Sequence, residues 1–280
     1  MTQHLPPSNS PPGARNILGD GIGFCHVYRV APQDGDQEIV DFARVCVAGL
    51  KPVESNRGLI RYLMRHRHTT PFESVQVWIH VKAPIFVARQ WFRHRTWSYN
   101  EISGRYAELP PGVYDPQKHE WRAQSSDNRQ GSDPAIGLDQ TRCLLTAVPA
   151  YEASRIAYEK LLALGVAREQ ARFTLPLAQY TEWRCSVDLW NLMHFLGLRL
   201  DPHAQAEIQA YAKSILGQLR PYAPLAMDAF EDYHLKGETF SSAEMELLRE
   251  CVSGRAFSTE AAQEKGLSLR EIQELQAKLG

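Results

Sequence analysis

Residues 89–106 read RQWFRHRTWSYNEISGRY, the most unusual stretch of the 280-residue chain. It carries four arginines against one carboxylate, Glu101, although the whole chain has 31 basic and 32 acidic residues and a formal net charge of -1. Arginine stays charged at any working pH and offers paired planar donors that match phosphate oxygens. Small donors and a point of close backbone approach follow at Ser98, Asn100, Ser103 and Gly104. The stretch therefore predicts a local phosphate-binding site.

Composition alone leaves two other interpretations of this stretch open. It could be a solvated, arginine-rich helix end in which His94 is simply satisfied by neighbours. It could also bind nucleic acid, because aromatic side chains that could stack on bases interleave with the arginines at Trp91, Phe92, Trp97 and Tyr99. The near-neutral total charge provides no global field for a nucleic acid or an anionic membrane. We therefore predict neither of these partners.

Outward from this stretch, the hydrophobic pattern predicts strands and helices. Apolar residues alternate with polar ones over 75–82, which is typical of a half-buried strand, and Pro84 should end it and begin a helix over about 84–93. Residues 21–30 also favour a strand, and Asp36 could N-cap the helix that follows.

Helical periodicity predicts most of the remaining elements. Helices are expected over about 57–67, 141–164 and 203–220, from Leu189 onward, and in a short segment after Pro224. The polar residues 115–140 are rich in turn formers and should form a long surface loop without a stable element.

The two ends of the chain differ from its middle. Residues 1–20 are rich in proline and small polar residues, which predicts a flexible arm. Residues 238–280 contain two capping-box patterns, Ser241 to Glu244 and Ser268 to Glu271, and should form a helical appendage. Residues 21–237 are then expected to form one α+β domain, in which several helices surround a central mixed or antiparallel sheet.

Composition also excludes several classes of protein. The five cysteines are an odd number without a CxxC pair, which predicts reduced, mostly buried thiols and neither a disulfide framework nor a zinc site. A metal site is not expected from His66, His68, Glu73 and His80, since they lack metal-ligand spacing. No export signal and no run of roughly 18 apolar residues is present, so we predict a cytoplasmic protein.

The arginine-rich stretch also carries a motif. Residues 93–106 fill all nine fixed positions of RHRxxSxNExSxRY, which resembles the signature of the flavin-dependent thymidylate synthases. Further segments similar to that family are HTTPFES at 68–74, APIFVARQWF at 83–92, AREQARFTLPLAQYTEW at 167–183 and LMHFLGLRLDPHAQAEI at 192–208. The resemblance covers roughly residues 20–235, and it implies the α+β fold of the thymidylate-synthase-complementing type.

The resemblance implies an enzyme that methylates dUMP to dTMP. Methylenetetrahydrofolate would donate the carbon and leave as tetrahydrofolate, and FAD reduced by NADPH would provide the hydride. Family members are homotetramers whose FAD sites are shared between subunits. The cysteine-dependent thymidylate synthases instead need a thiol in a polar, basic pocket. Cys185 lies next to Arg184, but no cysteine here has the flanking residues of those enzymes.

The resemblance further assigns roles to individual residues. Contacts to FAD would come from Thr70, Arg93, His94, Arg95, Glu101, Asp188, Leu189, Trp190 and His194. Contacts to dUMP would come from Gln90, Trp91, Phe92, Arg93, Glu101, Ile102, Ser103, Gly104, Arg105 and Arg172. The catalytic side chain would be Arg199, whose fixed charge can stabilise the anion that develops on N3 and O4 of uracil. His68 would lie near the folate.

The chain departs from the family pattern at four positions. Asp188 and Trp190 replace a common Asn-x-Arg pair, His194 stands where Asn is common, and Cys46 stands where Ser is usual. Because a carboxylate repels a pyrophosphate, Asp188 is expected to accept from ribose or to cap a helix, and Trp190 to stack on adenine. An alternative is a flavoprotein that oxidises NADPH but has lost methyl transfer; the intact arginines at 105, 172 and 199 argue against it.

Overall fold

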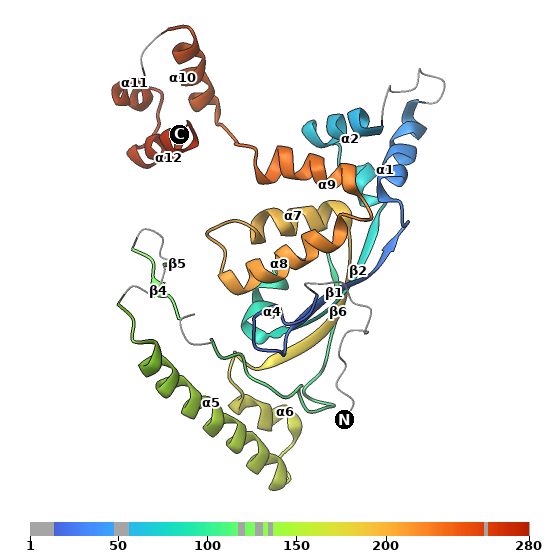
Figure 1. Cartoon of the computed structure of the whole chain (residues 1–280), viewed down its shortest axis with the longest axis vertical. Helices are drawn as coiled ribbons and strands as arrows, with labels where there is room; N and C mark the ends of the chain where they lie inside the picture. The colour runs from blue at the N-terminus through green and yellow to red at the C-terminus, as the bar shows by residue number, and fades with distance from the viewer. Residues whose placement is uncertain are drawn as a thin grey trace. The chain divides into compact units, whose positions relative to one another are not determined.

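The computed structural model describes residues 14–47, 56–116, 121–126, 131–133, 137–254 and 257–279 (Figure 1). The chain divides into two compact units, of which the first ends at Phe230 and the second begins at Glu231. The boundary predicted from the sequence, between residues 237 and 238, lies inside the second unit. Of the predicted N-terminal arm, only residues 14–20 are among those described.

A four-stranded antiparallel sheet forms the centre of the first unit. Its order is β1-β2-β6-β3, with β1 at Phe24–Ala31, β2 at Gln76–Pro84, β6 at Tyr180–Asp188 and β3 at Ser98–Glu101. The two central strands pair without a break from Gln76 opposite Asp188 to Pro84 opposite Tyr180. The predicted α+β class with an antiparallel sheet is confirmed.

The central strands owe their place to alternating side chains. Val77, Ile79 and Val81 of β2 are fully buried and alternate with half-buried residues, as the sequence predicts. Strand β6 has the same period, with Trp183 and Cys185 among its buried residues. Neither β6 nor β3 is among the strands predicted from the sequence.

Helices connect and cover the strands of the first unit. Their bounds are Gly35–Arg44 (α1), Val45–Val47 (η1), Asn56–Arg65 (α2), Thr70–Glu73 (α3), Ile85–Trp91 (α4), Gln140–Ala163 (α5), Arg168–Ala171 (α6), Arg172–Thr174 (η2), Leu189–Arg199 (α7), Ala206–Leu219 (α8) and Pro224–Phe230 (α9). Helices α4 and α7 pack on β6 and α8 packs on β1, beside one another on the sheet (Figure 1).

The start of α1 differs from the sequence prediction. Asp34, not Asp36, is the N-cap, because its carboxylate accepts from the backbone N–H of Gln37 at 3.0 Å. Asp36 instead accepts from the backbone N–H groups of Leu225 and Ala226, at 2.7 and 2.9 Å. This buried carboxylate therefore fixes the first turn of α9 to α1.

The core beneath the arginine-rich stretch is aromatic. The fully buried ring of Trp91, the last residue of α4, packs against four aromatic rings at centroid distances of 4.7 to 6.1 Å, those of Trp97, Trp183, Phe195 and Tyr211. This packing anchors α4 and the turn after it, so the arginines that follow are held on a rigid base.

The segment 115–140 is more ordered than the sequence predicts. A two-stranded antiparallel ribbon pairs β4 (Ala123–Gln124) with β5 (Ser132–Asp133). The expectation that this segment has no stable element is therefore wrong, although residues 117–120, 127–130 and 134–136 lie outside the described part of the chain.

The second unit has its own small helical core. It contains η3 (Glu231–Leu235), α10 (Ser242–Val252), α11 (Thr259–Glu264) and α12 (Leu269–Leu279), packed around Leu247, Ala262, Leu267, Ile272 and Leu275. Both predicted capping boxes are present. Ser241 and Glu244 exchange bonds at 3.3 and 2.6 Å, and Ser268 and Glu271 at 3.3 and 2.7 Å.

Candidate active site

The arginine-rich stretch presents unpaired cations at the surface. It leaves the C-terminal end of α4 and reaches β3 through a turn at residues 92–97. Arg89, Arg93 and Arg95 are exposed, and none of the three guanidinium groups bonds to another residue that the structure describes. Such groups attract phosphate, because no internal carboxylate competes for their donors.

A buried imidazole holds the predicted catalytic arginine. Arg199, at the end of α7, donates from Nε to Nε2 of His94 at 3.1 Å and from Nη2 to the carbonyl oxygen of Gln90 at 3.3 Å. His94 is 8% exposed, and its ring lies 4.9 Å from that of Phe195 and 6.0 Å from that of His194. The predicted residues Gln90, His94, His194 and Arg199 thus lie together.

The electrostatics of this pair favour a neutral histidine. Burial first, and then the charges of Arg199 and His194, lower the pKa of His94 to about 4. Burial also lowers the pKa of Arg199 below its usual value. His94 is therefore neutral near pH 7 and can accept with the nitrogen that faces the guanidinium.

A second group of predicted residues surrounds the end of β3. Glu101 accepts from the hydroxyl of Thr181 at 2.6 Å, and the backbone N–H of Ile102 donates to the carbonyl of Glu182 at 2.9 Å. These bonds attach the following turn, residues 103–107, to the edge of β6. A Cβ added at Gly104 would lie 3.2 Å from Cδ of Arg172, so this position allows the backbone to pack directly on the arginine stem.

One residue, Glu169, contacts both arginines of this second group. Arg105 pairs with Glu169 through Nε at 3.1 Å, and Arg172 donates from Nε to the backbone carbonyl of Glu169 at 3.3 Å. Both side chains of the ion pair are about half exposed, so the pair is weak in water. A phosphate dianion could replace this contact.

A third group lies where α3 meets the start of α7. Trp190 is half-buried, and its ring lies 5.9 Å from that of Phe72 in the helix that Thr70 begins. Asp188 is the N-cap of α7, with oxygens that accept from the backbone N–H and Nδ2 of Asn191 at 2.9 and 2.7 Å. Of its two expected roles, Asp188 therefore performs the helix cap.

The remaining predicted residues vary in exposure. Trp91 and Leu189 are buried in the core, which leaves their side chains no surface for a ligand. Phe92 is half-buried, with its ring 4.7 Å from that of Tyr99. His68 is exposed, and its ring lies 5.7 Å from that of Tyr62.

The cysteines offer no reactive thiol in the core. Burial raises the pKa of Cys25 and of Cys185 above the usual value of 9.0. Cys46 is exposed and two others are half-buried, so the expectation of mostly buried thiols is wrong. Within the part of the chain described, no three potential ligands gather into a metal site, and no helix is long and apolar enough to span a membrane.

Comparisons with known proteins identify the family. The sequence profile described as thymidylate synthase complementing protein matches residues 29–225. The chain belongs to this family. A curated relative named flavin-dependent thymidylate synthase, from Thermus thermophilus, is 49% identical over 79% of this chain and 81% of its own. Another of the same name, from Gluconobacter oxydans, is 44% identical over 92% and 85%.

A solved structure supports the same assignment. The UMP/dUMP methylase PolB from Streptomyces cacaoi, bound with 5-Br UMP, is 34% identical with a TM-score of 0.69, over 76% of this chain and 95% of PolB. The resemblance seen in residues 93–106 is thereby confirmed as membership of the thymidylate synthase complementing protein family.

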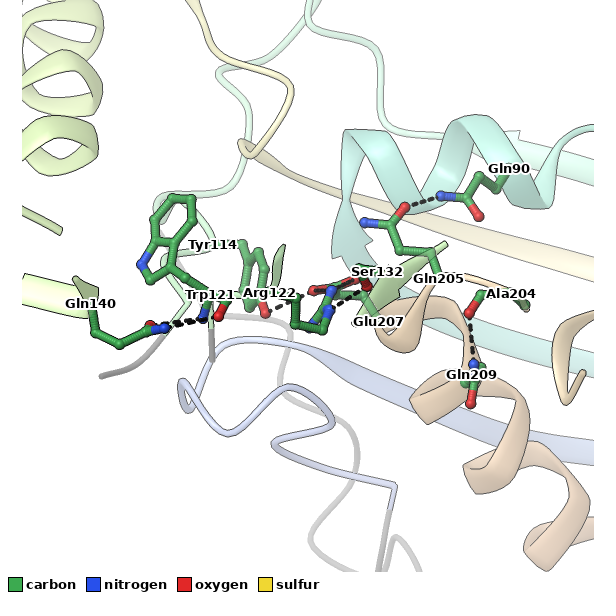
Figure 2. A network of polar contacts seen from close by, with 10 residues as sticks. All are labelled: Gln90, Tyr114, Trp121, Arg122, Ser132, Gln140, Ala204, Gln205, Glu207 and Gln209. Carbon is green, nitrogen blue, oxygen red and sulfur yellow. Dashed lines mark hydrogen bonds and ion pairs between the residues drawn. The ribbon is translucent and has the colours of Figure 1, made fainter. Parts of the chain in front are cut away.

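In this family member, several residues of the site were not found from the sequence. Thr181, Glu169 and Gln205 contact predicted residues, and Gln205 accepts from the side chain of Gln90 (Figure 2). All three lie in segments that carry the resemblance, 167–183 and 192–208, but no spacing in the sequence pairs them with their partners.

Proposed function

We propose that the protein is a flavin-dependent thymidylate synthase, which methylates dUMP to dTMP. The observation that carries this proposal is the partly buried bond from Arg199 to neutral His94. A cation fixed in this way cannot be neutralised by its neighbour, and it can stabilise negative charge that develops on a bound base. Curated relatives named for this activity and the dUMP methylase PolB support the proposal.

The nucleotide would be held by the second group of residues. Arg105 and Arg172 of this group, together with Arg93, provide guanidinium groups. Arg105 pairs with the exposed carboxylate of Glu169, whereas Arg172 donates to the backbone carbonyl of the same residue. Displacing an exposed ion pair costs little, so phosphate can take its place. Ser103 and the closely packed Gly104 would bring backbone N–H groups to the same anion, and Gln90 would contact the nucleotide from α4.

The residues present also fit a flavin nucleotide. Arg93 and Arg95 are exposed and unpaired among the described residues, and half-buried Trp190 offers a ring that could stack on adenine. The bound flavin would supply the hydride, with NADPH as its reductant and methylenetetrahydrofolate as the carbon donor. Asp188 would act here as the cap of α7, because both carboxylate oxygens accept from Asn191. His94, Thr70 and His194 would complete this site, and His68 would lie near the folate.

We also propose that the protein assembles into a homotetramer. Helix α5 and the segment after it leave large apolar side chains exposed, including Leu145 at 71%, Phe173 at 76% and Leu177 at 67%. Exposed apolar groups of this size on adjoining segments are typical of a protein interface. We expect light scattering to give a tetramer, and Leu145→Glu with Phe173→Glu to reduce it to smaller species. A monomeric wild type would contradict this part.

The activity is tested by following the product. Purified protein is incubated with FAD, NADPH, methylenetetrahydrofolate and dUMP, and dTMP and tetrahydrofolate are separated by chromatography with and without NADPH. NADPH-dependent formation of both products is expected. Oxidation of NADPH without dTMP would favour the flavoprotein that lost methyl transfer. Salt-dependent binding of oligonucleotides by a protein without flavin would favour a nucleic-acid-binding protein.

We expect the protein to be located in the cytoplasm, because its proposed substrates are water-soluble phosphorylated molecules.

Arg95→Ala tests the flavin site separately. It removes an exposed guanidinium that contacts no other described residue, so it should leave the fold intact and lower flavin occupancy. The visible absorbance per protein chain measures that occupancy, and a spectrum equal to that of wild type would remove Arg95 from the site. Lys213→Ala, at an exposed position on α8, is a matched control for loss of a cation.

A further inference from the structure

The N-cap of α8 is occupied by a residue that does not cap. Short polar side chains usually serve this position, because their oxygens reach the free backbone N–H groups of the first turn. Gln205 has the extended backbone of an N-cap residue, yet its side chain makes no bond to the helix. Its Oε1 instead accepts from Nε2 of Gln90 on α4 (Figure 2).

The connection that carries Gln205 is braced. It starts directly after Arg199 and spans residues 200–205. The side chain of Gln209 donates to the carbonyl of Ala204 at 2.6 Å (Figure 2), and the backbone N–H of Ala204 donates to the carbonyl of Asp201 at 2.9 Å. Arg199 and Gln205 therefore project from the two ends of one short, bonded segment.

A buried carboxylate anchors the same turn of α8. Glu207 is 5% exposed, and its oxygens accept from Nη2 of Arg122 at 2.7 and 2.9 Å and from the hydroxyl of Tyr114 at 3.2 Å (Figure 2). Arg122 also donates from Nε to Ser132 of β5 at 2.9 Å. Both donors to Glu207 belong to the chain that follows the turn at 103–107. The start of α8 is thus fixed by Glu207 to the chain that follows the turn at 103–107, and it contacts the side chain of Gln90 through Gln205.

We propose that Gln205 is a positioning residue for nucleotide binding, which acts by orienting the carboxamide of Gln90. The inference rests on the proposed function, because Gln90 contacts dUMP only under it. A carboxamide can present either its oxygen or its NH₂ group after a half rotation. The bond to Gln205 fixes the NH₂ group toward α8, so Gln90 presents its oxygen on the opposite side. The Glu207 cluster fixes the turn from which Gln205 acts.

Two substitutions of nearly equal size separate orientation from packing. Gln205→Glu keeps an acceptor for Gln90, whereas Gln205→Met keeps the volume and removes the acceptor. Neither changes the helix cap, because the side chain of Gln205 makes no cap bond. Binding of dUMP to the flavin-loaded protein is measured by calorimetry, and turnover at saturating dUMP is measured alongside.

We expect the Met variant to bind dUMP about fivefold to tenfold more weakly, which is the effect of one orienting hydrogen bond. Its turnover at saturating dUMP and its flavin spectrum should stay within about twofold of wild type, and the Glu variant should match wild type in all three. Wild-type affinity in the Met variant, or equal weakening in the Glu variant, would overturn the inference.

A double-mutant cycle tests whether Gln205 acts through Gln90. In a Gln90→Met background, Gln205→Met should cause no further loss of affinity, whereas additive losses would overturn the inference. If the Met variant does not hold flavin, Gln205→Asn provides the same test, because its shorter side chain cannot reach Gln90. A wild type that neither binds dUMP nor forms dTMP would overturn the proposed function as well. That result differs from a wild-type enzyme in which Gln205 has no effect.

Discussion

The folded protein should lose stability below neutral pH, because His94 takes up a proton more readily in the unfolded chain. Its pKa is about 4 in the folded chain against an ordinary value of 6.5, because burial and the charge of Arg199 oppose a second cation. Between these two values the unfolded chain binds a proton at this position that the folded chain does not. The free energy of unfolding therefore falls as the pH falls through this range.

The two pKa values set the size of this effect. From about pH 7.5 to about pH 5, the loss at His94 alone amounts to about 2 kcal/mol of unfolding free energy. His94→Gln removes the titration and keeps a side-chain oxygen that can accept from Nε of Arg199. Urea unfolding of both proteins at the two pH values, at one protein concentration and without added flavin, gives the difference directly.

The expected result is a fall with pH that is smaller in the variant by about 2 kcal/mol. Equal pH dependence in the two proteins would refute the reasoning, because it would mean that His94 titrates alike in the folded and unfolded chains. NMR of labelled histidine provides a second check, since the imidazole signals of His94 should show no titration near pH 6.5.

Three further substitutions test other parts of the structure. Arg199→Lys loses the paired donation to His94 and Gln90, so turnover at saturating dUMP should fall about 10²-fold with flavin occupancy unchanged, as product chromatography and absorbance can show. Arg122→Met leaves the buried carboxylate of Glu207 without its guanidinium partner and should lower the free energy of unfolding by about 3 kcal/mol, measured in urea. Ser241→Ala removes the cap of α10 and should cost about 1 kcal/mol, visible as faster amide exchange in α10 with unchanged turnover.

The elements predicted correctly carry their own periodicity. Strand β2 alternates from Gln76 to Ala83. In α8, the buried residues Ile208, Tyr211, Ala212, Ile215 and Leu219 recur at helical spacing. The missed strand β6 carries a similar signal, with Trp183, Cys185 and Val187 alternating with Glu182, Arg184 and Ser186. The sequence of this strand therefore contains the period of two that predicts it.

Strand β3 could not have been predicted in the same way. Its four residues are polar or aromatic, and Ser98, Asn100 and Glu101 are exposed. What makes it a strand is pairing with β6, from Ser98 opposite Ser186 to Glu101 opposite Trp183. Such a pairing depends on residues far away along the chain, so it cannot be predicted from local strand propensity.

In the candidate site, too, local features can be predicted from the sequence and long-range contacts cannot. The motif at residues 93–106 predicts which side chains would face a ligand, because the spacing of a motif is local. It did not identify what holds them, since His94 meets Arg199 and Glu101 meets Thr181 only after the sheet and α7 have formed. A functional side chain can thus be predicted from a motif, whereas its supporting partners require the fold.

The two N-caps beside the site show how a local rule can separate structure from function. Asp188 at the start of α7 obeys the capping rule, with both oxygens on Asn191, and this bonding alone explains why an acidic residue is tolerated there. Gln205 at the start of α8 breaks the rule, since its side chain leaves the helix for Gln90. A position that forgoes a cap worth about 1 kcal/mol needs a compensating reason, and the reason found here is a contact inside the site.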